Sequence, residues 1–175
     1  MGYNDLGPFN YADNWYYGTK APAGCVAVAM AQVLKYFNEP GLYPYISMPL
    51  GQQSSPATAT MIEDLGDMVD MDYGCDWSSA SQFAATNSFI WYLNYTDVDV
   101  TDNITTTNMM QQINWFKPII LSGGTRKKHT FYTEYTKGHM WVSDGYRYAF
   151  YNVRDSYGNC TGEGTGFVSL HMNWG

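Results

Sequence analysis

The 175-residue sequence has few cysteines, few basic residues and no long apolar run. Its three cysteines cannot all pair within one chain, and no two of them are spaced like zinc ligands. We therefore expect neither a closed disulfide framework nor a structural zinc site. The 9 lysines and arginines stand against 16 acidic residues, and the net charge of -7 argues against a nucleic-acid partner. No run approaches the ~18 apolar residues of a membrane span.

Neither a targeting segment nor a binding patch stands out in the sequence. The opening MGYNDLGPFN lacks the apolar core of a signal peptide, so any leader or pro-segment is expected outside this sequence. The one basic run, Arg126 to His129, is expected to be a solvated loop. If Cys25 stays free, an oxidising compartment would allow Cys75 and Cys160 to pair, which the sequence leaves undecided.

The sequence does contain enough apolar material for one core. Hydrophobic residues make up 45%, and 175 residues is about the size of one domain, so residues 1–175 are expected to form a single domain. Apolar residues recur at helical spacing in four segments. These predicted helices are at 25–38, 57–69, 80–95 and 107–116. Ser78 or Ser79 is expected to cap the third helix.

After Pro118 the pattern changes from helices to strands. Short aromatic and β-branched runs are separated by Gly and Asn, which is typical of strands and hairpins. The predicted strands are PIILSGG, HMWVSDGY, YAFYNVRDS and GFVSLHMNW. The segments DMDYGCDWSS and NVRDSYGNCTGEGTG are expected to be loops. Helices followed by strands predict an α+β domain with an antiparallel sheet.

Cys25 occupies the first turn of the most regular predicted helix, in the stretch APAGCVAVAMAQVLKYF. Unpaired backbone N–H groups and the positive end of the helix dipole favour a thiolate at such a position. A nucleophilic cysteine is therefore one interpretation. The other is a small buried apolar residue, which is what a free cysteine usually is.

A cysteine nucleophile needs a base, and histidine is its usual partner. His129 follows a basic run and is expected to be exposed, and His171 is expected to lie on the opposite sheet face from Met172. His139 directly follows Gly138 at the start of a predicted strand, where a side chain is held rigidly but stays open to a cleft. Cysteine, then histidine, then asparagine before tryptophan is the order of a papain-type thiol protease.

Five segments of the chain, taken in order, carry a family pattern. They are GPFN, AGCVAVAMAQVLKYFNEP, VDMDYG with the SA that follows it, GHMWVSDGY and LHMNWG. Together they closely resemble the streptopain family, which are secreted bacterial cysteine proteases of the papain-like fold. The resemblance implies one papain-like catalytic domain over residues 1–175. Its N-terminal helical part would carry the nucleophile helix, and its C-terminal part would be an antiparallel β-sheet.

The resemblance also implies catalytic roles for four residues. Cys25 is the nucleophile, and its backbone N–H donates to the oxyanion. His139 is the general base and later the acid that protonates the leaving amine. Asn173 orients the imidazole of His139, and Trp174 shields it from water. Taken alone, a structural histidine, a turn asparagine and a packed tryptophan would be the ordinary interpretations.

Ser79 and Gly138 match positions that line the substrate cleft in the family, and a glycine lets an extended peptide approach the backbone closely.

Where the family supplies a Gln to the oxyanion hole, this chain has Asp5, with Asn4 as the nearest substitute. A carboxylate repels an oxyanion unless it is protonated, and loss of such a donor costs ~10²–10³ in turnover. The family continues beyond NWG, so we expect a fragment or a reduced variant.

A secreted bacterial enzyme with a protein or peptide substrate, no cofactor and no metal is implied, with an inhibitory pro-segment outside this chain. We expect a monomer, because the predicted helices leave no evident apolar surface stripe. Two alternatives stay open. One is a catalytically weak or inactive papain-like domain that binds peptides or proteins, which Asp5 favours and the presence of both Cys25 and His139 disfavours. The other is a thiol amidase or acyltransferase acting on small amides or cell-wall peptides.

Overall fold

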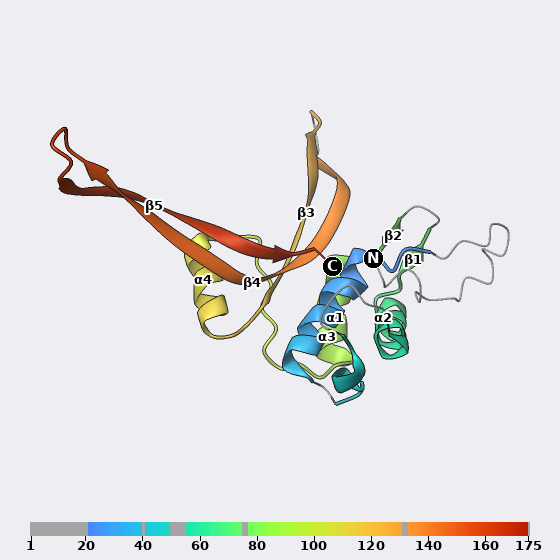
Figure 1. Cartoon of the computed structure of the whole chain (residues 1–175). Helices are drawn as coiled ribbons and strands as arrows, with labels where there is room; N and C mark the ends of the chain where they lie inside the picture. The colour runs from blue at the N-terminus through green and yellow to red at the C-terminus, as the bar shows by residue number, and fades with distance from the viewer. Residues whose placement is uncertain (1–20, 40, 50–54, 75–76, 131–132, 175) are drawn as a thin grey trace. The chain divides into compact units, whose positions relative to one another are not determined.

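The computed structural model describes residues 21–39, 41–49, 55–74, 77–130 and 133–174 (Figure 1). Helices and antiparallel sheet occur together, which confirms the expected α+β class. In chain order the elements are α1 (Cys25–Phe37), the 3-10 helix η3 (Tyr45–Ser47), α2 (Pro56–Met68), β1 (Asp72–Tyr73), β2 (Ser78–Ser79), α3 (Gln82–Trp91), α4 (Thr106–Asn114), β3 (Ile119–Lys128), β4 (Thr133–Arg154) and β5 (Cys160–Asn173).

The chain divides into two compact units, each of which is described by itself. The first unit comprises Met1–Val100, Ile120–Val142 and Trp174–Gly175, and the second comprises Thr101–Ile119 and Ser143–Asn173. Strands β3, β4 and β5 follow one another in a single three-stranded sheet. The long strand β4 therefore contributes its first half to the first unit and its second half to the second.

Helices α1, α2 and α3 of the first unit pack around one hydrophobic core. Met30 and Leu34 on α1 and Leu65 on α2 are fully buried. Met140 and Val142, from the first half of β4, join the same core. Burial of a side chain of this size stabilises the fold by about 1.5–3 kcal/mol. Helix α1 is buried around most of its circumference, so packing on several sides holds it in place.

All four predicted helices are present, and their ends differ from the predicted ones by at most four residues. The largest difference is at the end of α3, which stops at Trp91 rather than at residue 95. Asn94 adopts a left-handed φ of 57°, and the backbone N–H of Tyr95 turns back to the carbonyl of Phe89 at 2.8 Å. Such a turn ends a helix because the chain reverses direction.

The segment before α3 corrects two predictions. DMDYGCDWSS is not wholly a loop, because Asp72 pairs with Ser79 and Tyr73 with Ser78 in the antiparallel hairpin of β1 and β2. The predicted cap at Ser78 or Ser79 was therefore wrong, since both serines belong to β2. The N-cap of α3 is Ser81, whose hydroxyl accepts the backbone N–H of Phe83 at 3.2 Å.

The strands are longer than the sequence pattern predicted. Strand β4 already begins at Thr133, so His139 lies inside a strand and not at its start. The basic run is also strand rather than loop, since β3 extends to Lys128. Of the predicted loop NVRDSYGNCTGEGTG, only residues 155–159 form the turn. Backbone N–H donors of this turn, that of Asn159 first, lower the pKa of Asp155.

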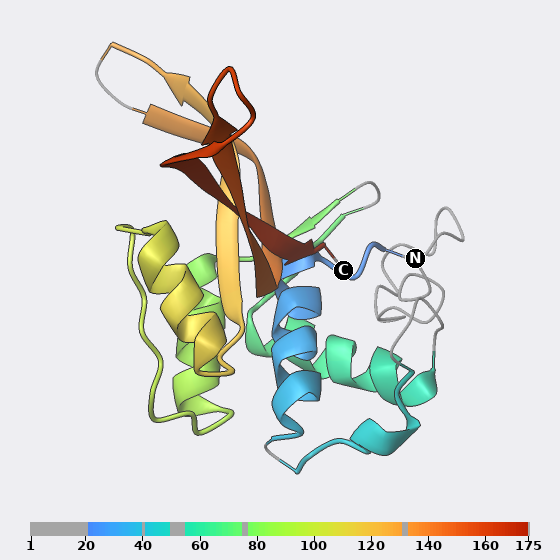
Figure 2. The ribbon, with the colours of Figure 1, turned by 60° about the vertical axis from the view of Figure 1, so that its left-hand side comes forward.

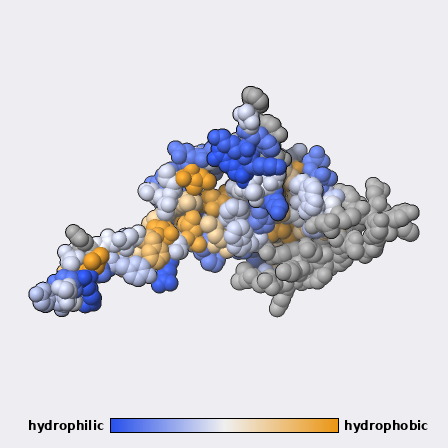
Figure 3. Space-filling view, turned by 90° about the horizontal axis from the view of Figure 1, so that it is seen from above, coloured by the Kyte–Doolittle hydropathy of each residue, from blue (hydrophilic) through white to orange (hydrophobic). Residues whose placement is uncertain are grey.

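In the second unit, β4 and β5 form a hairpin with exposed aromatic residues. Tyr148, Phe150 and Tyr151 are all exposed, and Figure 3 shows orange, pale and blue atoms mixed along this hairpin. A Cβ at Gly164 would collide with the ring of Phe150, and one at Gly166 with that of Tyr148, so two rings lie against glycines. The expectation of no apolar surface stripe concerned the helices, and these exposed aromatic residues lie on strands instead.

Candidate active site

Cys25 is the first residue of α1 and carries a half-buried free thiol. The preceding residue, Gly24, is the N-cap, and no side chain of the described residues caps this helix end. The first N–H groups of a helix have no partner within the helix, and they carry the positive end of its dipole. An anion such as a thiolate is stabilised at this position.

Gly24 fixes the backbone directly in front of Cys25. Its φ of 80° and ψ of 131° form a conformation that residues with a side chain rarely adopt. A Cβ at this position would also lie 2.7 Å from both Sδ and Cε of the buried Met71. Glycine is therefore needed here for two reasons, the backbone conformation and the close approach of Met71.

The chain in front of Cys25 is also held by the β1–β2 hairpin. The hydroxyl of Ser78 donates a hydrogen bond of 2.6 Å to the carbonyl oxygen of Pro22. The Cβ of Ser78 lies 3.5 Å from the point that a Cβ on Gly24 would occupy. Strand β2 therefore contacts the start of α1 through a hydrogen bond and through packing.

His139 is half-buried on β4, and its imidazole lies against two indole rings. Its ring centroid is 6.0 Å from that of Trp141 with an interplanar angle of 16°, and 5.6 Å from that of Trp174 with an angle of 20°. The two indoles are 4.8 Å apart, so each ring of this three-ring cluster contacts both others. The separations are typical of favourable aromatic pairs.

The backbone just before His139 is irregular. Lys137 has a left-handed φ of 54° inside β4, which is typical of a β-bulge, a feature that re-aims neighbouring side chains and is common beside active sites. Gly138 is exposed, and no heavy atom lies within 4 Å of the position that its Cβ would take. On β3, a Cβ at Gly124 would lie 2.8 Å from the carbonyl oxygen of Thr136, so the two strands approach closely here.

Cys25 and His139 belong to the same unit and are connected by its core. Val26, next to Cys25, and Met140, next to His139, are buried in one cluster. Figures 1 and 2 show the first half of β4 passing beside the N-terminal end of α1. The structure thus brings the two backbones to one part of the unit.

One family covers most of this chain. The model of the Peptidase C10 family matches residues 42–175. The chain belongs to the Peptidase C10 family. This is the streptopain family of cysteine-type peptidases, so the family expected from the five segments is confirmed. No curated protein matches the chain.

The match to the Peptidase C10 family covers only part of the predicted site. It includes Ser79, Gly138, His139 and the C-terminal Asn-Trp segment. Its first residue follows α1, so the assignment of Cys25 depends on its place at a helix start and on the resemblance of the segment around it.

The other residues predicted from the Peptidase C10 resemblance lie in different surroundings. Ser79 is exposed on β2, opposite Asp72. Asn173 is the exposed last residue of β5, and Trp174 joins the three-ring cluster while 56% exposed. Asp5, predicted at the oxyanion position, lies outside the described residues, as does its neighbour Asn4.

The two other histidines of this Peptidase C10 chain are in different environments from His139. His129 is half-buried, which corrects its predicted exposure. His171 is exposed, and its Nδ1 lies 2.5 Å from Oδ1 of Asp144. Its carbonyl oxygen accepts the hydroxyl of Ser143 at 3.0 Å. Both His171 and its partners belong to the second unit, whereas Cys25 belongs to the first.

Sequence reasoning missed Trp141 and the glycine that accommodates it. A Cβ at Gly123 on β3 would lie 3.1 Å from Cη2 of Trp141 and 3.6 Å from Cζ3. The alternation of a strand places residues two apart on one face, so the pair His139 and Trp141 could have been found from the sequence. Trp174 contacts both rings from the end of the chain, and no pattern in the sequence around it predicts this contact.

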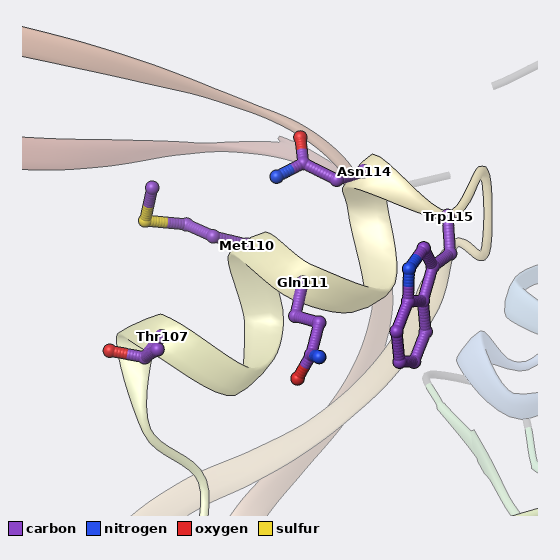
Figure 4. Close-up of a pocket in the computed structure, with 5 residues that line it drawn as sticks. All are labelled: Thr107, Met110, Gln111, Asn114 and Trp115. Atoms are coloured by element: carbon purple, nitrogen blue, oxygen red, sulfur yellow. The ribbon is translucent and has the colours of Figure 1, made fainter.

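A surface hollow of the described residues lies elsewhere. It has a volume of about 350 Å³ and is lined by Thr107, Met110, Gln111, Asn114 and Trp115 (Figure 4). All five belong to α4 or directly follow it, and Figure 4 shows Gln111 and Trp115 pointing to the same side of the helix. This is a shallow surface feature of the second unit, and it contains none of the predicted site residues.

The described part of the chain has no group of three or more His, Cys, Asp or Glu side chains placed to hold a metal ion. None of its helices has the length and apolar character needed to cross a bilayer. Cys160 is a free and exposed thiol, and Cys75, the cysteine that the sequence allowed to pair with it, lies outside the described residues.

Proposed function

We propose that this chain is a papain-like cysteine endopeptidase that hydrolyses peptide bonds of protein substrates. The observation that carries the proposal is the placement of Cys25 as the first residue of a helix anchored in the core. Membership of the Peptidase C10 family gives the class of chemistry, and the strand that carries His139 belongs to the same unit.

In the proposed mechanism, the imidazole of His139 takes the proton from Sγ of Cys25, and the thiolate attacks the carbonyl carbon of the scissile bond. The oxyanion that forms accepts a hydrogen bond from the backbone N–H of Cys25. The C–N bond then breaks, His139 protonates the leaving amine, and a thioester acyl-enzyme remains. His139 next deprotonates a water molecule, which hydrolyses the thioester and frees Cys25.

Four other residues complete the proposed site. Asn173 orients the imidazole, and Trp174 shields it from water, a role that the ring contact at 5.6 Å supports. Ser79 and Gly138 line the cleft, and the open space at Gly138 supports the close approach of an extended peptide there.

We further propose that the enzyme is a bacterial secreted monomer, that it needs no metal or cofactor, and that its precursor carries an inhibitory pro-segment. These proposals rest on the family resemblance. Assay of a precursor before and after removal of its upstream segment would test the inhibition, and light scattering would test the oligomeric state.

The central experiment is the pH dependence of Cys25 alkylation by iodoacetamide, read by mass spectrometry. Near pH 6 we expect labelling roughly 10- to 100-fold faster than that of an ordinary thiol with a pKa of about 8.5. His139→Ala should slow the labelling, whereas His171→Ala, a matched change on the same sheet, should not. Slow labelling with the profile of an ordinary thiol, unchanged by His139→Ala, would contradict the proposal.

A peptide- or protein-binding domain without turnover is the second candidate, and Asp5 at the position of the family's Gln favours it. A panel of peptides and small amides separates the candidates, because turnover of small amides alone would indicate an amidase or acyltransferase. If the chain is a peptidase limited by its oxyanion site, Asp5→Gln should raise kcat, by up to ~10²-fold. Binding of peptides without cleavage by either form would favour the second candidate.

A further inference from the structure

The contact between His139 and Trp141 is built into the strand that carries both. They are two residues apart on β4, so they share a face, and their rings are close to parallel at 16°. Trp174 packs on Trp141 at 4.8 Å and on His139 at 5.6 Å. The imidazole therefore has neighbours that restrict both its position and the tilt of its plane.

Position 123 on β3 is a glycine, and the absence of a side chain there makes room for the indole of Trp141. A Cβ at Gly123 would lie 3.1 Å from Cη2 of Trp141, which is closer than most Cβ contacts. The indole thus packs against the backbone of β3, and any larger residue at position 123 would displace it. Gly123 and Trp141 together fix one surface of the space in which His139 lies.

We propose that Trp141 is a positioning residue for His139, and this inference rests on the proposed function. In the reactive state the Sγ–H bond of Cys25 has broken and an N–H bond has formed on His139, which is then an imidazolium. A cation within about 6 Å of an indole ring is attracted by its π face. Trp141 thus holds the imidazole in orientation and stabilises the charged pair relative to thiol and neutral imidazole.

A purely structural role for Trp141 makes a different prediction. If the indole only fills space, Trp141→Leu, which keeps an apolar side chain, should preserve the chemistry in every molecule that folds. If the aromatic face matters, Trp141→Phe should preserve most of the activity and Trp141→Leu should not. Trp91, which is 76% exposed in the same unit, provides the matched control pair Trp91→Phe and Trp91→Leu.

The test is the Cys25 alkylation rate as a function of pH for the full chain and these variants. We expect Trp141→Leu to lower the rate near neutral pH by roughly 2- to 5-fold, which is the factor that a cation–π contact at a partly exposed site supplies. The rise of the alkylation rate with pH should move to higher pH, because the thiolate–imidazolium pair is less stabilised, and Trp141→Phe should restore most of the wild-type profile. With a peptide substrate, kcat should fall more than KM rises.

A second variant and a second readout keep the inference testable if Trp141→Leu does not fold. Gly123→Ala retains the indole but displaces it, so it should lower the rate in the same direction. The NMR signal of the His139 imidazole, which neighbouring rings shift, should move in Gly123→Ala and Trp141→Phe but not in Trp91→Phe. An unmoved signal would overturn the inference.

The outcomes separate this inference from the function on which it rests. If His139→Ala slows alkylation but Trp141→Leu retains the wild-type profile, the inference is wrong and the proposed function stands. If the wild-type protein labels like an ordinary thiol and His139→Ala changes nothing, both are wrong. Equal effects of Trp141→Leu and Trp91→Leu would also overturn the inference, because they would show a general effect on stability.

Discussion

The hydroxyl of Ser78 donates a hydrogen bond of 2.6 Å to the carbonyl oxygen of Pro22, a residue 56 positions earlier in the chain. Ser78 also pairs with Tyr73 across the β1–β2 hairpin. This bond and the packing of the Ser78 Cβ beside Gly24 together hold the segment that leads into α1. The position of Cys25 therefore depends on a residue that is distant in sequence.

Replacing Ser78 with alanine is expected to lower the free energy of unfolding by about 1 kcal/mol. Cys25 alkylation should also slow severalfold, because the start of the helix loses its tie and misplacement of reacting groups is costly. Ser47→Ala is the matched control, since its hydroxyl donates to the carbonyl of Pro44 at 2.7 Å in an exposed turn. Equal effects of the two variants on alkylation would contradict the assigned role.

Gly24→Ala should be strongly destabilising. The left-handed backbone costs an L-residue about 1–2 kcal/mol, and crowding against Met71 adds about 1–3 kcal/mol. Urea unfolding measures the change, and Gly41→Ala, where no atom lies within 4 Å of the added Cβ, is the control. Adding Met71→Ala to Gly24→Ala should not restore wild-type stability, because the backbone strain remains. Full recovery would show that crowding alone matters.

The helices were predictable because their signals are local. Apolar spacing and the polar or glycine residues at the ends are within a few positions of one another, so α1 begins at the predicted residue. The end of α3 was missed because Asn94 adopts a left-handed conformation, which asparagine tolerates but does not require. The cap was misplaced because Ser78, Ser79 and Ser81 have equal intrinsic capping ability, and strand pairing decides among them.

The sheet and the site were less predictable because they depend on distant partners. The segments HMWVSDGY and YAFYNVRDS were predicted as two strands, but they form the single strand β4, in which a Cβ at Gly145 would lie 3.4 Å from the Cβ of His171. Cys25 and His139 could be chosen from the sequence by residue type and order. The packing of Trp174 against His139 could not, because nothing near Trp174 in the sequence specifies its partner.

Alkaline pH should weaken the first unit through Tyr95. Burial first, and then the charges of Tyr45 and Glu39, raise the pKa of Tyr95 from 10.0 to about 12. A raised folded-state pKa means that this stabilisation is complete below about pH 10 and is lost as pH rises toward 12. Tyr95→Phe should therefore flatten the decrease in unfolding free energy above about pH 10. Urea titrations across this range measure it, and a slope no flatter than that of the exposed-site control Tyr92→Phe would contradict the prediction.

Truncation within the core of α1 should affect stability more than chemistry. Leu34 is fully buried, and Leu34→Ala is expected to cost about 2–5 kcal/mol in unfolding free energy. Leu42→Ala, at a site that is 61% exposed, should cost no more than about 0.5 kcal/mol. At a temperature where both variants are folded, Cys25 alkylation should proceed at the wild-type rate in each. A slow rate in folded Leu34→Ala would show that packing in the core changes the reactivity of the Cys25 thiol directly.

From Lys137, whose left-handed φ of 54° is irregular for a strand, the side chains of β4 alternate between its two faces. His139 and Trp141 lie on one face of the strand, and the buried Met140 and Val142 lie on the other. An extra residue before Lys137 would leave this alternation of faces unchanged. An extra residue between Lys137 and His139 would turn the His139 side chain toward the core and the side chains of Met140 and Val142 away from it. The proposed catalytic histidine and the core residues of this strand therefore cannot change faces independently of one another.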